Sequence, residues 1–112
     1  MDMFEEERSQ LEVMDKRRRD RELVDIRNVI SSPSGRRLLW RILSGCHLYS
    51  KLFSPDQLVM AYNTGRHAVG IELLADLDEA KPGIYHQMSR EAVSDAKSEM
   101  KGRQGNEDQG GG

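Results

Sequence analysis

The chain has 112 residues, of which 37% are hydrophobic and only 5% aromatic, which suits one small domain and not two. Charged residues make up 32%, but the formal net charge is only −2, so overall charge does not predict nucleic-acid binding. No apolar run approaches the roughly 18 residues that a membrane span needs, and the first residues lack the basic-then-apolar pattern of a secretory signal. We therefore expect neither a membrane span nor a signal peptide.

Residues 1–20 are mostly charged and predict a helical N-terminal arm. Asp15 and Arg19 stand four apart in the order that supports a solvated helix. Leu11 and Met14 give the arm only a thin apolar edge. A short helix without tertiary cover is marginal in water, so we expect the arm to fray when the protein is alone.

The arm also carries four closely spaced arginines that are candidates for contact with phosphate or with a partner protein: Arg17, Arg18, Arg19 and Arg21. Acidic residues interrupt this group and offer partners within the same helix. The pattern therefore favours a solvated or partner-facing arm over a phosphate-binding patch, and both readings stay open.

The helical domain is expected over residues 21–101. Leu23, Ile26 and Ile30 share one face of a first helix, which should end before Pro33 because the residue preceding a proline avoids the helical region. Residues 102–112 contain no apolar side chain and predict a disordered tail.

A central helix follows, and its start signal is clear. Ser32 can cap the first turn, and Pro33 fits the first helical position. The side chains at Leu39, Ile42 and Leu43 recur at helical spacing, and Gly45 is a plausible stop near Ser44. Because this apolar face is wide, we expect other helices to cover it.

A long helix is predicted over residues 55–79, with Ser54 as its cap and Gln57 completing a capping box. Gly65 and Gly70 each cost such a helix about 1 kcal/mol relative to Ala, which suggests close packing or a bend. A break into two shorter helices near Gly65 is the alternative.

The last helix should run from Pro82 to about Met100. The predicted fold is thus all-α: a small bundle of about four helices with a charged helical arm and a disordered tail.

Catalytic patterns are lacking. Cys46, the only cysteine, lies on an apolar helical face and is expected to be a small buried hydrophobe in a reducing compartment. Glu72, Asp76 and Glu79 form an acidic row that is most simply a solvent face. The histidines lack zinc-ligand spacing. We expect no enzyme activity, no cofactor and no metal.

A second group of arginines is the better candidate for partner binding: Arg36, Arg37, Arg41 and Arg66. The first two lie in the first turn of a helix, where the helix dipole disfavours cations. Such a departure indicates either tertiary ion pairs or an anionic partner. The structural alternative is pairing with Asp25, Glu72 or Asp76.

Three segments together resemble a known family. Residues 32–43 read SPSGRRLLWRIL, residues 65–74 read GRHAVGIELL, and Pro82 is followed by Tyr85. Their order and spacing are similar to those of the Bbp-nineteen-like family of small tailed-phage, podophage-like proteins. His67 departs from the pattern, since the family has a second arginine there.

The resemblance implies a product of the virion-assembly region of a phage genome and carries no catalytic residue. We therefore expect a non-enzymatic structural or assembly protein that contacts portal, capsid or internal virion proteins, or itself. Its location would be the virion, or the host cytoplasm during assembly. The alternative is a small nucleic-acid-binding phage protein that uses the arginine-rich arm.

Overall fold

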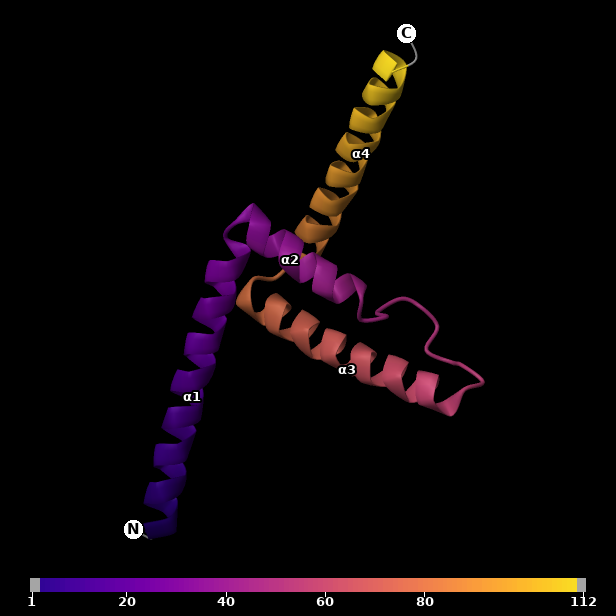
Figure 1. Ribbon diagram of the computed structural model, residues 1–112. Coiled ribbons are helices and arrows are strands. Elements are labelled where there is room, and N and C mark those ends of the chain that lie inside the picture. The colour runs from indigo at the N-terminus through magenta and orange to yellow at the C-terminus, as the bar shows by residue number, and fades with distance from the viewer. Residues whose placement is uncertain (1–2, 111–112) are drawn as a thin grey trace.

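The computed structural model describes the backbone of residues 3–110 and the side chains of residues 3–104. It contains the helices α1 (Met3–Ile30), α2 (Pro33–Ser44), α3 (Gln57–Ala80) and α4 (Ile84–Gly110) (Figure 1). Within these residues there is no strand. The predicted all-α fold of four helices is confirmed.

The four helices form an open, extended arrangement. The radius of gyration is 20.9 Å, whereas a compact chain of this length has about 13 Å. The principal extents are 85 × 41 × 18 Å. Figure 1 shows α1 and α4 projecting in opposite directions from a junction at which they meet α2 and α3. The compact packing expected of a bundle is therefore confined to that junction.

The core is small and lies at the junction. All four helices contribute to it, and its fully packed members are Ile30, Leu43, Leu77, Ile84 and Met88. Leu77 near the end of α3 is 0% exposed, and Ile84 and Met88 in the first turns of α4 are each 1% exposed. Around this centre, partly buried side chains such as Trp40 and Tyr85 pack with their rings 5.5 Å apart.

The corner between α1 and α2 follows the sequence prediction. Ser32 caps α2, since its hydroxyl accepts a hydrogen bond from the Gly35 N–H at 3.1 Å. A Cβ built on Gly35 would overlap the Val29 carbonyl oxygen, so only glycine fits so close to the end of α1. Gly45 ends the helix as expected.

The apolar face of α2 is covered less completely than expected. Leu43 is buried, but Leu38 and Ile42 remain 47% and 42% exposed. The expectation that other helices cover the whole face is wrong, because α1 and α4 project away from α2 (Figure 1) and a hollow separates Ile42 from α3.

Helix α3 is unbroken, which confirms the single long helix. Its cap is Asp56 and not Ser54, because the Asp56 carboxylate accepts hydrogen bonds from Leu58 N–H at 2.9 Å and Val59 N–H at 3.3 Å. The Ser54 hydroxyl instead accepts from the Asp56 N–H. The helix therefore begins two residues later than predicted.

The two glycines of α3 differ. A Cβ on Gly70 would lie 2.5 Å from the Cβ of Cys46, so this glycine allows α3 to approach the turn after α2. A Cβ on Gly65 would meet nothing within 4 Å. The packing reason inferred from the sequence therefore holds for Gly70 alone.

The N-terminal arm is helical as predicted, whereas the C-terminal helix extends further than expected. Residues 3–20 of the arm continue into α1 without a break, and α4 runs past Met100 to Gly110. Residues 3–18 and 93–104 are exposed, so these helical segments are held by backbone hydrogen bonds without tertiary cover. Residues 111–112 and the side chains from residue 105 onward lie outside the described residues, so the disordered tail stays a prediction for that part.

The corner can be tested with a glycine substitution. We expect Gly35→Ala to lower the free energy of unfolding by about 1–3 kcal/mol, because its methyl group would overlap backbone that cannot easily move. Urea unfolding followed by circular dichroism measures the change. The matched control is Gly65→Ala, which has open space and should stabilise the chain by up to about 1 kcal/mol. Equal effects at the two positions would contradict the tight corner.

Candidate functional site

Arg36 is a structural residue at the centre of the junction. Its Nε donates a hydrogen bond to the Glu91 carboxylate at 2.9 Å, and its Nη1 donates to the Ile30 carbonyl oxygen at 2.9 Å. The side chain is only 15% exposed. One guanidinium thus joins the start of α2 to α4 and to the last carbonyl of α1. The sequence correctly allowed a tertiary ion pair, but Glu91 was not among the partners it suggested.

The same contact changes the acidity of its partner. The hydrogen bond from Arg36 holds the pKa of Glu91 below its usual value, and the Gln87 amide, which donates to the same carboxylate at 2.9 Å, acts in the same direction. Both stabilise the charged form of the carboxylate. Glu91 therefore stays ionised beside Arg36 at neutral pH.

Arg37 and Arg41 stand four residues apart on α2 and are exposed. Neither forms a hydrogen bond or ion pair within the described part of the chain. Arg37 is close enough for its charge to help lower the pKa of Glu91. These two guanidinium groups are the open cations of the junction.

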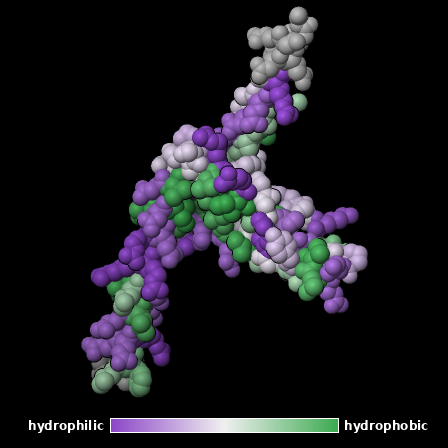
Figure 2. Space-filling view, viewed as in Figure 1, coloured by the Kyte–Doolittle hydropathy of each residue, from purple (hydrophilic) through white to green (hydrophobic). Residues whose placement is uncertain are grey.

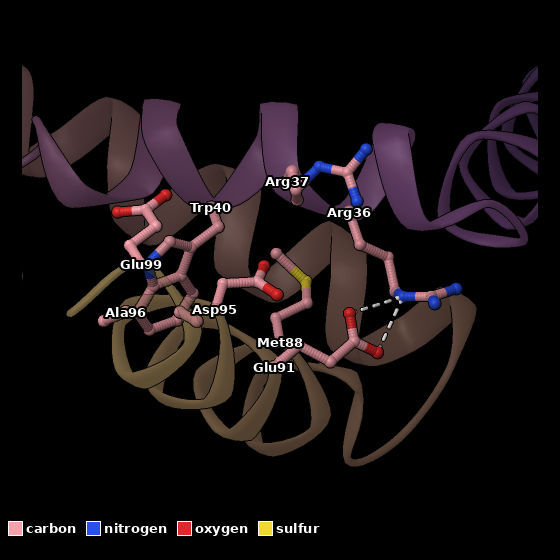
Figure 3. A pocket seen from close by; sticks show the side chains of 9 residues that line it. Arg36, Arg37, Trp40, Met88, Glu91, Asp95, Ala96 and Glu99 are labelled. Carbon is pink, nitrogen blue, oxygen red and sulfur yellow. Dashed lines mark hydrogen bonds and ion pairs between the residues drawn. The ribbon is translucent and has the colours of Figure 1, made fainter. Parts of the chain in front are cut away.

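A hollow of about 270 Å³ lies between α2 and α4 (Figure 3). Arginines of α2, carboxylates of α4 and the side chains of Trp40 and Met88 line it, and the Arg36–Glu91 ion pair bridges the two helices. Its lining consists of Arg36, Arg37, Trp40, Met88, Glu91, Ala92, Asp95, Ala96 and Glu99. This arrangement can receive an amphipathic side chain or helix, but it holds no nucleophile next to a base.

Arg66 belongs to a different surface. Its Nε donates to the Gly45 carbonyl oxygen at 2.7 Å, its Nη1 donates to the Tyr62 hydroxyl at 2.7 Å, and its guanidinium lies 5.6 Å from the centre of the Tyr62 ring. The hydrogen bond with Tyr62 raises the pKa of Arg66. Arg66 lines a hollow of about 420 Å³ between α2 and α3 that also contains Ile42 and Val69. The predicted arginine group is thus divided, since Arg36 and Arg37 line the hollow between α2 and α4 and Arg66 lines the one between α2 and α3.

The arm arginines divide in the same way. Arg19 donates to Asp76 at 2.9 Å, and also to Glu79 and Glu22, so α1 is tied to α3. The pKa of Glu79 is lowered mainly by its hydrogen bond with Arg19. The acidic row of α3 is therefore an anchoring surface for α1, and its reading as a plain solvent face is wrong at these two positions.

The other arm arginines are open. Arg17, Arg18 and Arg21 are exposed, line a shallow hollow with Met14, and make no hydrogen bond or ion pair within residues 3–104. Their position on one side of α1 is what a surface for an anionic partner requires.

Cys46 is buried and 3% exposed, as predicted, and its Sγ donates to the Ile42 carbonyl oxygen at 3.2 Å. Among the described residues, no group of three or more potential ligand side chains is placed to hold a metal ion. No helix in that part of the chain is both long and apolar enough to cross a bilayer.

The central part of the sequence matches a known protein family. A family model described as Bbp19-like phage protein matches residues 26–90, which is more than half of the chain. The match includes all of α2 and α3, the end of α1 and the first turns of α4. The chain belongs to the Bbp19-like phage protein family, and the resemblance drawn from its three sequence segments is confirmed. Neither the curated proteins nor the solved structures gave a significant match.

Arg36 and Arg37 allow a direct test of the difference between a structural arginine and an open one. We expect Arg36→Ala to lower the free energy of unfolding by about 1–3 kcal/mol, because it leaves the Ile30 carbonyl and the Glu91 carboxylate without their donor. Arg37→Ala is the matched control and should change it by no more than about 0.5 kcal/mol. Urea unfolding of both variants measures these changes. Equal losses in the free energy of unfolding would contradict a structural role that Arg36 has and Arg37 lacks.

Stability should also depend on acid pH. The pKa values of Glu79 and Glu91 are lower in the folded chain than their ordinary value of 4.5. The unfolded chain therefore binds more protons in acid, so stability is full above that value and is lost as pH falls through the folded-state pKa values. Urea midpoints should decrease from about pH 5 to pH 3. Arg36→Ala removes the largest cause of the lowered Glu91 pKa, so the urea midpoint of this variant should decrease less steeply over the same pH range.

Proposed function

We propose that this Bbp19-like phage protein is a non-enzymatic structural or assembly protein that acts through protein–protein contacts. Its work would lie in head or portal assembly, or within the virion as an internal component. Membership of a phage protein family supports the setting. The shape and surface of the chain support the mode of action.

The observation that carries the proposal is the amount of apolar surface outside the small core. Scattered exposed apolar residues are ordinary, but here they cover part of the junction and form smaller groups along the helices that project from it (Figure 2). Those on the far half of α3 and on the connection that precedes it are Tyr49, Phe53, Leu58, Tyr62 and Val69, with exposures from 57% to 82%. Surfaces of this kind are typical of chains that are completed by a partner.

The open arginines add a polar part to such a contact. Arg37 and Arg41 flank the half-exposed Leu38 on α2. The guanidinium group of an arginine can form a bidentate pair of hydrogen bonds with a carboxylate. Arginine beside apolar side chains is a common composition at the centre of protein interfaces. A virion protein with an acidic, partly apolar surface, such as a portal, capsid or internal protein, is the partner this chemistry fits. The protein would then be found in the virion, or in the host cytoplasm during assembly.

A second candidate function is nucleic-acid binding through the arm. Arg17, Arg18 and Arg21 are open cations along one helix, which is what phosphate contact requires. However, acidic residues occur in the same segment, and Arg19 is already occupied by α3. Titration of duplex DNA at two salt concentrations separates the two functions, because phosphate binding decreases steeply as salt rises.

Mass spectrometry of purified particles of the encoding phage provides the main test. We expect the chain at a defined copy number in the particle, or in assembly intermediates if its role ends earlier. The variant Arg37→Glu with Arg41→Glu should lower its incorporation about tenfold or more, because reversed charges oppose an acidic partner. The circular dichroism of the variant should not change.

The control for this experiment is Lys51→Glu with Lys97→Glu. It reverses two exposed cations elsewhere on the chain and should leave incorporation unchanged. Absence of the chain from particles and from every assembly intermediate, despite expression, would refute the proposed function.

A further inference from the structure

The outer half of α1 is not buried by any other helix in the described part of the chain. Every described residue before Arg19 is exposed, and α1 first meets the rest of the molecule at Arg19 and Leu23 (Figures 1 and 2). A mostly charged helix of this length gains little from its own side chains. This part of α1 can therefore be stabilised by a partner that binds its exposed side chains.

One line of side chains runs along this half with the spacing of a coiled-coil seam. Glu7, Leu11, Met14 and Arg18 follow one another at steps of four, three and four residues, so they share one side of the helix. Leu11 and Met14 are 60% and 57% exposed. We call these four residues the α1 seam.

The α1 seam is accessible along its whole length. The side chains with which α1 holds the junction, among them Arg19 and Leu23, lie about a third of a helical turn away from it. A second helix can therefore lie on the seam without displacing α3.

We propose that the α1 seam pairs with the same seam of a second copy of this chain, in antiparallel orientation. In the pairing register Leu11 of each copy lies against Met14 of the other, and Glu7 of each copy lies opposite Arg18 of the other. The interface is two-fold symmetric, as closed homodimers are. It has an apolar centre and an ion pair at each end.

The charge distribution of the helix determines both the occupant and the orientation. Residues 3–15 contain five acidic side chains and one basic one, and residues 16–21 contain five basic ones and one acidic one. An antiparallel copy places the acidic segment beside the basic one. A parallel copy would place Glu7 beside Glu7 and Arg18 beside Arg18, and like charges across such a seam oppose pairing.

The flanking positions agree with this register. Arg8 and Asp15 occupy equivalent positions beside the seam, and the antiparallel pair brings Arg8 of one copy near Asp15 of the other. Residue 22 of one copy then lies opposite residue 3 of its partner. The two junctions are thus held at opposite ends of the paired helices and do not collide.

This dimer goes beyond the proposed function and does not depend on it, because it rests on the surface of α1 alone. The full chain is studied by sedimentation equilibrium over a range of concentrations. We expect a reversible monomer–dimer equilibrium that weakens as salt is raised, because screening reduces the attraction between the exposed ion pairs. Monomer at every concentration would overturn the proposal.

Charge reversal tests the register. Glu7→Arg alone and Arg18→Glu alone should each weaken the dimer about tenfold or more, because each puts like charges together at both ends of the seam. The two changes in one chain restore opposite charges in the antiparallel pair and should restore the dimer. In a parallel pair the combined change restores nothing, so failure of the double variant to recover would overturn the antiparallel register.

Matched controls separate the seam from the rest of the helix. Glu12→Arg and Lys16→Glu make the same kinds of charge change on the other side of α1, and should leave the equilibrium nearly as in the unmodified chain. Leu11→Asp should abolish the dimer while circular dichroism shows the junction helices retained. Dimerisation that survives Leu11→Asp, or that is lost equally in the controls, would assign it to another surface and overturn the proposal.

Discussion

The corner at which α1 turns into α2 is the constraint on which the rest of the structure depends. Gly35 lets the first turn of α2 approach the last carbonyls of α1, and Arg36 then spans from the Ile30 carbonyl to Glu91 on α4. The fully packed core contains only five side chains. A core of that size contributes modestly, so the polar link that fixes three helices at one point has a large share in the arrangement.

The arginines show how one residue type serves two purposes. Arg19 and Arg36 are held by carboxylates of other helices and join the parts of the junction. Arg37 and Arg41 lie one and five residues after Arg36, yet point their charge to solvent. The family match covers residues 26–90, so it contains Arg36 and the five core side chains. It leaves out Arg19, Glu91 and the part of α1 with the open arm arginines.

Local signals in the sequence predicted the elements well, since caps and stops act over a few residues. Ser32, Pro33 and Gly45 bounded the central helix, and the burial of Cys46 followed from its helical face. What failed depends on contacts between distant segments. The partner of Arg36 and the exposure of Ile42 depend on how the helices are placed relative to one another, which no local pattern encodes.

The difference between local signals and distant contacts also explains how much of the candidate site could be predicted. The arginines were identifiable because cations in the first turn of a helix break a local rule. The sequence did not show which of them are occupied, because occupation requires Glu91, Asp76 and Glu79 to be placed by the fold. The shift of the α3 cap from Ser54 to Asp56 is a smaller case, in which two capping residues stand two positions apart and the carboxylate accepts from the helix N–H groups.

Anchoring one half of a helix affects what its other half can do. Arg19 bound to Asp76 and Glu79, and Leu23 buried beside them, fix the direction in which α1 leaves the junction. The exposed half is then presented along a defined axis. Ordering a binding segment before it meets its partner lowers the entropic cost of association. Any contact made by the arm stabilises the junction in turn, because whatever binds only the folded chain shifts the folding equilibrium toward it.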